Sequence, residues 1–310
     1  MRIVIALGGN ALLHRGEALS AENQRTNVKI AAAALAPLAL EHQLVITHGN
    51  GPQVGLLALQ YSAHKEGVHY PLDILDAESE GMIGYLVEQE LSNLLPAGHR
   101  CATLLTQTEV DPNDPAFQNP TKPIGPVYDR TEARRLAVQR GWSIAPDGEF
   151  FRRVVPSPRP RQILEMGVIE LLVERQVTVI CAGGGGIPVV RRKDGQIIGV
   201  EAVIDKDFAS ALLARELGAD ALVMLTDVEA VYQGWGEADT RALRRVSAGE
   251  LRQLKFAPGS MGPKVAAACE FVEQAGGLAG IGQLKDASAL LSGEAGTLIT
   301  QDASDTLWWD

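Results

Sequence analysis

Glycine-rich turns follow three apolar segments of this 310-residue chain, and they are the first feature that suggests chemistry. The turns are Gly8-Gly9-Asn10, Gly49-Asn50-Gly51 and Gly183-Gly184-Gly185. Glycine lets the backbone approach a ligand closely, and a helix that follows the turn adds partial positive charge. One such turn is as often only a tight connection, whereas three at one sheet edge favour a site for an anion such as phosphate. None of the three fits the dinucleotide fingerprint or the P-loop spacing.

Three of the eight lysines stand where a surface lysine is unusual. Lys122 lies among prolines, Lys206 lies between Asp205 and Asp207, and Lys264 opens a predicted helix. A lysine at a helix start is unfavourable unless an anion is bound there. Lysines around a phosphate cradle suit phosphoryl transfer, in which the protein mainly positions groups and neutralises charge. Asp205 and Asp207 could orient Lys206, bind Mg²⁺, or simply cap the helix that follows.

Composition disfavours several other classes of function. A net charge of −10 and a pI of about 5.2 disfavour a nucleic-acid partner, because such a surface repels phosphate backbones. No apolar run approaches the ~20 residues that span a bilayer, so no membrane partner is expected. Three widely spaced cysteines and a short N-terminal apolar run fit a cytoplasmic protein. The histidines lack metal-ligand spacing and no nucleophile elbow occurs, so neither a resident metal site nor a covalent nucleophile is expected.

The segments that must position these residues alternate between short apolar runs and longer stretches with helical patterning. Strands are predicted at Ile3–Leu7, Leu44–Thr47, Ala102–Thr106, Val177–Cys181, Ala221–Thr226 and Gly296–Thr300. Helices are predicted at Ser20–Leu40, Gln53–Ser62, Leu75–Leu95, Phe208–Leu217 and Val265–Gln274. This alternation is typical of right-handed βαβ units, so we expect an α/β fold with a mostly parallel central sheet.

One stretch interrupts the alternation. Between Asp111 and Pro160 the chain carries nine prolines, which block long helices and remove backbone donors. A structureless loop of that length is improbable in a compact domain, so residues 111–160 are predicted to form a small inserted subdomain. Its helix is predicted at Thr131–Arg140, and a meandering surface loop is the alternative. Further on, Val189–Val200 predicts a β-hairpin with Asp194-Gly195 at its turn.

Several of these motifs occur together in one known family, and the sequence resembles the carbamate kinases, which have the amino-acid-kinase fold. The similarity extends from Val4 to about Leu298. The motifs that carry it are Ala6–Ala11, His48–Gly55, Asn119–Pro126, Val154–Pro158, Gly183–Val189, Glu201–Asp207 and Phe256–Lys264.

The resemblance implies a three-layer αβα sandwich in a single domain, residues 1–310, working as a homodimer. Residues 111–160 would be a protruding lid over the substrate. The reaction would be carbamoyl phosphate + ADP = carbamate + ATP with Mg²⁺, running toward ATP in catabolism. The N-terminal half would bind carbamoyl phosphate and the C-terminal half the nucleotide.

The resemblance also implies roles for particular residues. Lys206 and Lys264 would neutralise the transferring phosphoryl group, Asp207 would orient them, and Lys122 would reach the substrate phosphate from the lid. Residues expected to hold the substrate or its phosphate are Gly8, Gly9, Asn10, Gly49, Asn50, Gly51, Gly183, Gly184 and Gly185. Residues expected around the nucleotide are Thr226, Asp227, Val228, Tyr232, Met261, Gly262 and Lys264. Mg²⁺ would be held mainly by the nucleotide phosphates.

Two stretches depart from the family pattern. Gly148-Glu149-Phe150-Phe151 carries an acidic residue in the lid where many members carry a basic one. Gly280–Leu284 replaces a stretch that is often Ile-Thr-Ser-Leu, which removes a polar contact near the nucleotide. The residues around Arg15–Leu19 and Glu22–Gln24 resemble carbamate kinases of purine (allantoin) catabolism more than those of arginine fermentation.

Two other functions stay open on the sequence alone. A kinase for another small carboxylate would use the same fold, because a fold does not determine the substrate. A non-catalytic ligand-binding paralogue would need a lost lysine or a broken glycine turn, and the sequence has neither.

Overall fold

The computed structural model describes residues 1–13, 16–64, 70–237, 239–257, 259–302 and 305–310. Its central element is a ten-stranded sheet with the order β13-β14-β16-β15-β12-β1-β2-β9-β3, in which β17 pairs with β14. The strands are β1 (Arg2–Leu7), β2 (Gln43–His48), β3 (Arg100–Thr103), β9 (Val177–Ile180), β12 (Ala221–Thr226), β13 (Val231–Gln233), β14 (Arg241–Ser247), β15 (Leu278–Gln283), β16 (Thr297–Thr300) and β17 (Leu307–Trp308).

Pairing in this sheet is mostly parallel, as the sequence predicts. β1 lies between β2 and β12, and both pairs are parallel, as are those of β9 with β2 and β3. The antiparallel pairs gather toward the other edge, where β16 runs against β15 and β13 against β14. The carboxyl ends of β1, β2, β9 and β12 therefore meet at one edge, where α/β proteins bind ligands.

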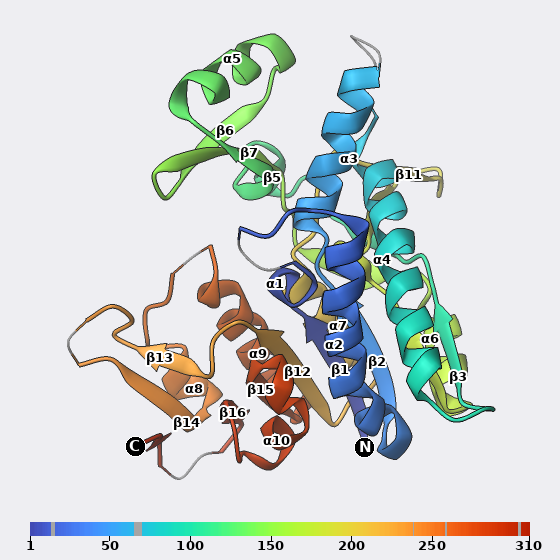
Figure 1. Ribbon diagram of the computed structural model, residues 1–310, viewed down its shortest axis with the longest axis vertical. Coiled ribbons are helices and arrows are strands. Elements are labelled where there is room, and N and C mark those ends of the chain that lie inside the picture. Colours follow the sequence, from blue (N-terminus) through green and yellow to red (C-terminus); the bar gives the residue numbers. More distant parts are fainter. Residues whose placement is uncertain (14–15, 65–69, 238, 258, 303–304) are drawn as a thin grey trace.

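Helices cover both faces of the sheet, so the expected three-layer αβα sandwich is confirmed (Figure 1). One face packs against α2 (Ala21–Glu41), α4 (Leu72–Leu94) and α10 (Ala287–Ser292). The other packs against α6 (Met166–Glu174), α7 (Lys206–Glu216), α8 (Ala248–Leu251) and α9 (Met261–Ala275). Successive residues of β1 serve the two faces in turn, because strand side chains alternate. Among the described residues, no helix is long and apolar enough to cross a membrane.

A second sheet has the order β11-β10-β4-β8. Its strands are β4 (Gln107–Val110), β8 (Pro160–Ile163), β10 (Ile187–Arg191) and β11 (Ile197–Gly199). β10 and β11 form the predicted hairpin, with Gly195 at φ +86° in its turn. The predicted strand Ala102–Thr106 is shifted along the chain. The observed strand β3 begins earlier, at Arg100, and ends at Thr103, because the backbone then leaves the central sheet and enters β4 of this second sheet.

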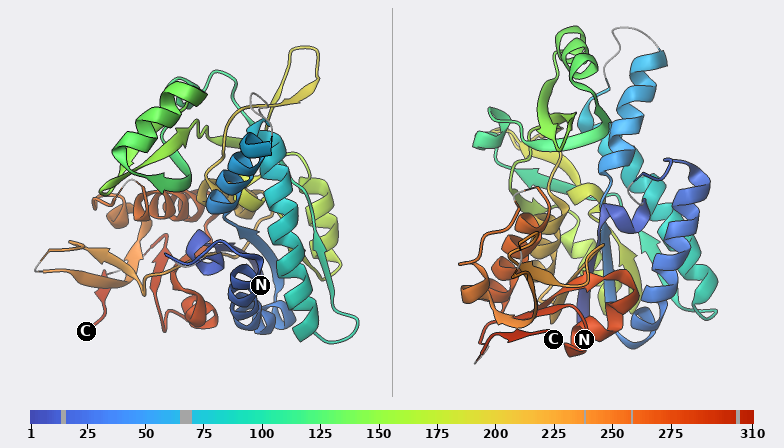
Figure 2. Two further views of the ribbon diagram at one scale, coloured as in Figure 1. Left: turned by 45° about the horizontal axis from the view of Figure 1, so that its top comes forward. Right: turned by 60° about the vertical axis from the view of Figure 1, so that its left-hand side comes forward.

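A small unit protrudes from the sandwich in all three views (Figures 1 and 2). It contains the three-stranded sheet β5-β7-β6 and one helix. Its elements are β5 (Lys122–Tyr128), α5 (Arg130–Arg140), β6 (Ser143–Asp147) and β7 (Phe150–Val155). α5 confirms the predicted helix, with Asp129 capping its start and Gly141 ending it at φ +65°. This unit, residues 122–155, is called the lid below. It lies inside the stretch 111–160, whose flanks hold η1 (Pro115–Phe117) and the start of β8.

The lid contacts the sandwich through α3 (Gly51–His64). A Cβ on Gly55 of α3 would lie 1.9 Å from the Cα of Gly125 in β5, so only glycine fits at position 55. Beside this contact, Val54 packs in one apolar cluster with Ile124 and Val155 of the lid.

Candidate active site

Two of the predicted glycine turns pack directly on each other at the carboxyl edge of the sheet. Gly8 ends β1 and leads into α1 (Gly9–Leu12), and Gly49 separates β2 from α3. The N–H of Gly8 donates to Leu225 O over 2.9 Å, which ties this turn to the end of β12. A Cβ on Gly49 would lie 3.3 Å from both the N of Gly9 and the Cδ of Lys206. The two turns and Lys206 therefore meet at one point. Of Asn10, the backbone lies in α1, and its side chain lies outside the described part.

A cluster of two lysines and one carboxylate lies at this point. Lys206 Nζ is 2.6 Å from Asp207 Oδ1, and Lys264 Nζ is 3.2 Å from Asp207 Oδ2. The lysines come from the first turns of two helices, α7 and α9, that pack side by side. The structure thus brings Lys264 to Asp207, which lies 57 positions away along the chain. Asp207 binds both lysines, as its predicted orienting role requires.

Burial and charge make this cluster strongly coupled. Burial opposes ionisation of Asp207, but Lys206 and Lys264 outweigh it and hold the pKa of this carboxyl far below its usual range. Burial also opposes the charge of Lys206, but Asp207 and Asp205 raise its pKa. The charge of Lys206, with burial, lowers the pKa of Lys264. Two cations face one carboxylate, so the cluster carries net positive charge suited to an anion.

Asp205 resolves an alternative that the sequence leaves open. Its Oδ1 accepts the N–H of Asp207 over 2.9 Å and caps α7, while its Oδ2 lies 2.6 Å from Lys122 Nζ of the lid. Asp205 is therefore both a helix cap and the partner of the lid lysine. Lys122 stays the most exposed of the three predicted lysines, at 32% of its side chain.

The first turn of α7 is fixed to the central sheet by hydroxyl groups. Ser210 Oγ donates to Lys206 O over 2.6 Å and lies 2.6 Å from Thr47 Oγ1 in β2. Both side chains are fully buried. These hydrogen bonds fix the backbone of Lys206 relative to β2, the strand that precedes the Gly49 turn.

The third glycine turn packs against the side chains of His48 and Asn50 and is surrounded by protein. It forms η2 (Gly183–Gly185), and all its residues are buried. The N–H of Gly183 donates to Glu80 Oε1 and that of Gly185 to Ala182 O. In this conformation these two donors are used within the protein, and Gly184 packs on the side chain of Asn50. Direct phosphate binding by Gly183, Gly184 and Gly185 stays a prediction, and the observed geometry favours a supporting role.

Sequence analysis missed a buried polar strip on α4 beneath the site. Asp76, Ser79 and Glu80 are each at most 1% exposed. Asp76 and Ser79 contact Asn50, and Glu80 also accepts the N–H of Thr106. The spacing i, i+3, i+4 places them on one face of the helix. The sequence does carry a signal for this strip, because three polar residues occupy core positions of a predicted helix. Burying a polar side chain costs free energy unless it has a hydrogen-bond partner.

The predicted nucleotide residues lie along the end of β12 and the start of α9. Thr226 ends β12, and Asp227 and Val228 follow it. Thr226 Oγ1 donates to Asp227 Oδ1 over 3.2 Å, and Gln283 of the departing stretch contacts Asp227 O. Tyr232 in β13 stacks edge-on with Trp235, with ring centres 5.0 Å apart. At α9, Met261 and Gly262 precede Lys264, and the N–H of Gly262 donates to Ala257 O.

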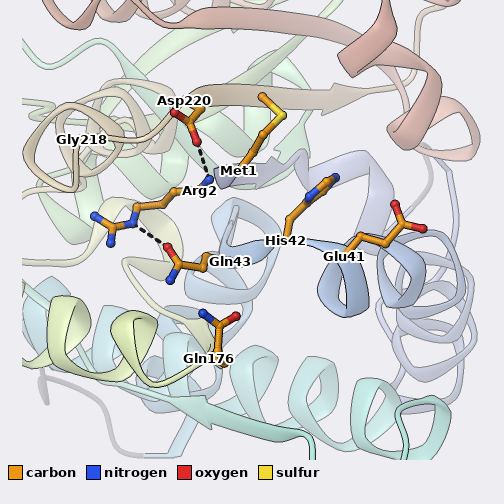
Figure 3. A pocket seen from close by; sticks show the side chains of 8 residues that line it. All are labelled: Met1, Arg2, Glu41, His42, Gln43, Gln176, Gly218 and Asp220. Carbon is orange, nitrogen blue, oxygen red and sulfur yellow. Dashed lines mark hydrogen bonds between the residues drawn. The ribbon is translucent and has the colours of Figure 1, made fainter.

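A cavity of about 490 Å³ lies at the opposite edge of the sheet, where β1, β2, β9 and β12 begin (Figure 3). Arg2 dominates it, donating from its N–H to Asp220 and from Nε to Gln43. None of the predicted site residues lines this cavity. It is separated from the glycine turns by the full length of the strands.

Comparison with known proteins shows the family in which this arrangement occurs. The pattern of the amino acid kinase family matches residues 1–279. The carbamate kinase of Rhizobium meliloti (strain 1021) is 58% identical over 310 residues, 99% of this chain and 96% of the relative. That of Haemophilus influenzae is 56% identical over 97% of both. The solved structure of carbamate kinase from Giardia lamblia bound to AMP-PNP covers 97% of this chain and 98% of its own, with 43% identity and a TM-score of 0.88. The chain belongs to the amino acid kinase family and groups within it with the carbamate kinases.

Proposed function

We propose that this kinase transfers a phosphoryl group reversibly between carbamoyl phosphate and ADP, giving carbamate and ATP. The observation that carries the proposal is the contact of the Lys206–Asp207–Lys264 cluster with the Gly49 turn at the carboxyl edge of the sheet. The choice of substrate is supported by relatives named carbamate kinase at more than half identity over nearly the whole chain.

The chemistry needs positioning and charge neutralisation rather than a covalent nucleophile. Carbamate is already an anionic nucleophile, so it attacks the γ-phosphoryl group without a general base. Lys206 and Lys264 neutralise the charge on the phosphoryl oxygens, and Asp207 keeps both ammonium groups in place. Gly9 and Gly51, the first residues of α1 and α3, would offer backbone N–H groups to the phosphoryl group. Gly8 and Gly49 would fix the two turns, because their N–H groups donate to Leu225 O and Leu7 O.

The nucleotide would lie along the end of β12, beside Thr226, Asp227, Val228 and Tyr232, with Met261 and Gly262 near its phosphates. The Giardia lamblia relative bound to AMP-PNP supports a nucleotide site in this fold. Asp207 is already engaged by two lysines, and one oxygen of Asp205 caps α7. We therefore expect Mg²⁺ to be held by the nucleotide phosphates, where it would screen their charge.

The lid would close over carbamoyl phosphate, with Lys122 leaving Asp205 to bind the substrate phosphate. The Lys122 side chain is 32% exposed, and Asp205 would keep the charge of Lys206 nearby when Lys122 leaves. Glu149 lies at the exposed turn between β6 and β7, so the acidic departure changes the lid tip and not the transfer cluster.

In the cell we place the reaction in the cytoplasm, running toward ATP in catabolism of purines or of arginine, and carried out by a homodimer. Reaction direction follows from the substrate, because an acyl phosphate is a stronger phosphoryl donor than ATP. The resemblance around Glu22–Gln24 supports the purine assignment.

The test is a coupled assay for ATP formed from ADP, Mg²⁺ and carbamoyl phosphate, with acetyl phosphate and glutamyl phosphate as comparison donors. Rapid ATP formation from carbamoyl phosphate alone is the expected result. Equal or faster turnover with another donor would transfer the assignment to that carboxylate. Absence of turnover with all three, in a folded sample that binds ADP, would leave a binding protein.

A further inference from the structure

The side chain of Asn50 is held from one side by α4. Its Nδ2 donates to Asp76 Oδ1 and to Ser79 Oγ, both over 2.9 Å. An amide nitrogen has two hydrogens, so both are used inside the protein. Asn50 itself is 2% exposed. Its amide nitrogen is therefore engaged as an anchor inside the protein.

The opposite side of Asn50 is closed by η2. A Cβ on Gly184 would lie 2.2 Å from Asn50 Nδ2, and Gly184 adopts φ +69°, so only glycine fits there. Asn50 is thus clamped between α4 and a turn that has no side chain. Its neighbour Gly49 touches Gly9 and Lys206, so a shift of the clamp would move the transfer centre directly.

Asp76 is the polar anchor of this clamp, and its position is costly. It is 1% exposed, and its Oδ2 has no hydrogen-bond partner within the described residues. Burial raises the pKa of Asp76 well above the ordinary carboxyl range, although the Asn50 amide partly opposes this. A neutral carboxyl costs less to bury than a carboxylate, but an apolar residue would cost less still. Among the described residues, the hydrogen bond to Asn50 is the interaction that accounts for a carboxyl group at this buried position.

We propose that Asp76 is a positioning residue for phosphoryl transfer, which acts by fixing Asn50 and through it the Gly49 turn against Gly9 and Lys206. Ser79 shares this role as the second acceptor of the Asn50 amide. This inference rests on the proposed function only in taking the site to be a centre of phosphoryl transfer. It does not depend on the identity of the acceptor, because any phosphoryl acceptor would need the same placement. A misplacement of about 1 Å at such a centre is enough to lower kcat by roughly 100-fold.

A double-mutant cycle tests whether Asp76 acts through Asn50. Asp76→Ala should lower kcat by about 30- to 100-fold while changing KM for ADP less than twofold. In the Asn50→Ala background, the same substitution should have almost no further effect on kcat, because its target is gone. An equal loss in both backgrounds would show a general structural role and overturn the proposal.

Two further variants separate positioning from folding. Asp76→Asn keeps an acceptor of the same shape and should keep kcat within about fivefold of the parent enzyme. Glu90→Ala removes another buried carboxylate of the same helix, which pairs with Arg25 and not with the site. It should lower the melting temperature without lowering kcat. A loss with Asp76→Asn as large as with Asp76→Ala, or a loss of kcat in Glu90→Ala equal to that in Asp76→Ala, would count against the proposal.

Binding of ADP–Mg²⁺ with aluminium fluoride, measured by calorimetry, gives a readout that needs no carbamoyl phosphate. Asp76→Ala should weaken this complex by at least tenfold and leave ADP binding unchanged. If the parent enzyme makes no ATP from carbamoyl phosphate, the proposed substrate is wrong, and the binding cycle still judges Asp76. Unchanged aluminium fluoride binding in Asp76→Ala would overturn the positioning role.

Discussion

The glycine turns and the lid border the same site, but they are held by different interactions. The turns contact each other and Lys206 so closely that a Cβ at Gly49 would lie 3.3 Å from its neighbours. Below them, Asn50 is clamped by buried hydrogen bonds to Asp76. The lid is tied near the site by Lys122, whose partner Asp205 comes from the other half of the chain.

This difference separates two tasks. Buried contacts without spare volume have few alternative arrangements, which suits a centre that must hold donor and acceptor in line. Lys122 is a flexible side chain that is 32% exposed, so it can change partners more readily than the buried lysines, which suits a segment that must admit a substrate. We therefore expect substitutions in the turns to change kcat and substitutions in the lid to change KM.

The largest effect is expected at the lysine that lies against the glycine turns. Lys206→Ala should lower kcat by roughly 1,000-fold, because it removes a charge that stabilises the transferring phosphoryl group. Asp207 keeps Lys264 as a partner, so circular dichroism and ADP binding should report a folded protein. Lys29→Ala, an exposed lysine of α2, is the matched control. Activity retained in Lys206→Ala would remove the assignment of the transfer site.

Gly49→Ala tests the packing of the turns alone. The new methyl group would press on the backbone of Gly9 and on Lys206, and we expect kcat to fall by about 10- to 100-fold with little change in KM. Gly167→Ala in α6 meets no atom within 4 Å and should leave the kinetics unchanged. Steady-state kinetics of both variants decide the matter. A rise in KM without a fall in kcat would mean that the turn binds substrate without positioning it.

Lys122→Ala tests the lid. We expect KM for carbamoyl phosphate to rise about tenfold, as for a lost charge-assisted hydrogen bond, while KM for ADP stays within twofold. Raising the salt concentration should weaken the parent enzyme toward the variant. Lys193→Ala, at the exposed turn of the β10–β11 hairpin, serves as control. If kcat fell while KM stayed constant, the lid lysine would belong to the transfer centre and the division of tasks would fail.

The smallest effect on turnover is expected from Glu80, the buried carboxyl group beside the turns, which instead changes how the free energy of unfolding depends on pH. Burial raises the pKa of Glu80 to about 8, so between pH ~4.5 and ~8 the folded protein holds a proton that the unfolded chain releases. The contribution of Glu80 to the free energy of unfolding is therefore greatest below pH ~4.5 and declines as the pH rises toward 8, by at most about 1.4 kcal/mol per pH unit.

Glu80→Gln should remove this decline. Melting temperatures of parent and variant, measured from pH 5.5 to 8, should differ most in favour of the parent at low pH and converge or cross at high pH. Glu22→Gln, with an exposed carboxylate, should follow the parent throughout. Parallel melting curves for Glu80→Gln would show that Glu80 is ionised in the folded protein.

Much of the fold and part of the site could be predicted because the signals are local. The strand β12 has the predicted bounds Ala221–Thr226, since a short apolar run before a turn has no competing interpretation. Glycine turns and isolated lysines are visible as residue types. The structure brings Lys206 and Lys264 together at Asp207, while their role in phosphoryl transfer stays a prediction. The sequence leaves three possible roles for Asp205. Only the folded structure shows that one carboxylate oxygen caps α7 while the other binds Lys122 of the lid.

The remaining features depend on contacts between distant segments. Asp76 and Glu80 belong to a helix whose other buried residues are mostly apolar, and their partners Asn50 and Gly183 lie 26 and 103 positions away. No periodicity shows which polar residues will find such partners. The end of β3 at Thr103 is likewise set by β4 joining another sheet, and propensity alone extends the strand.

The contact of Gly55 with Gly125 has a thermal consequence. At this joint the lid and α3 meet backbone to backbone, and the side chains beside it, Val54, Ile124 and Val155, are short or β-branched and lose little rotamer freedom. Ordering long side chains at a joint costs conformational entropy that grows in weight with temperature, and this joint has none to order. Lid closure at this point should therefore lose little of its strength on warming, unlike a hinge lined by lysine or methionine.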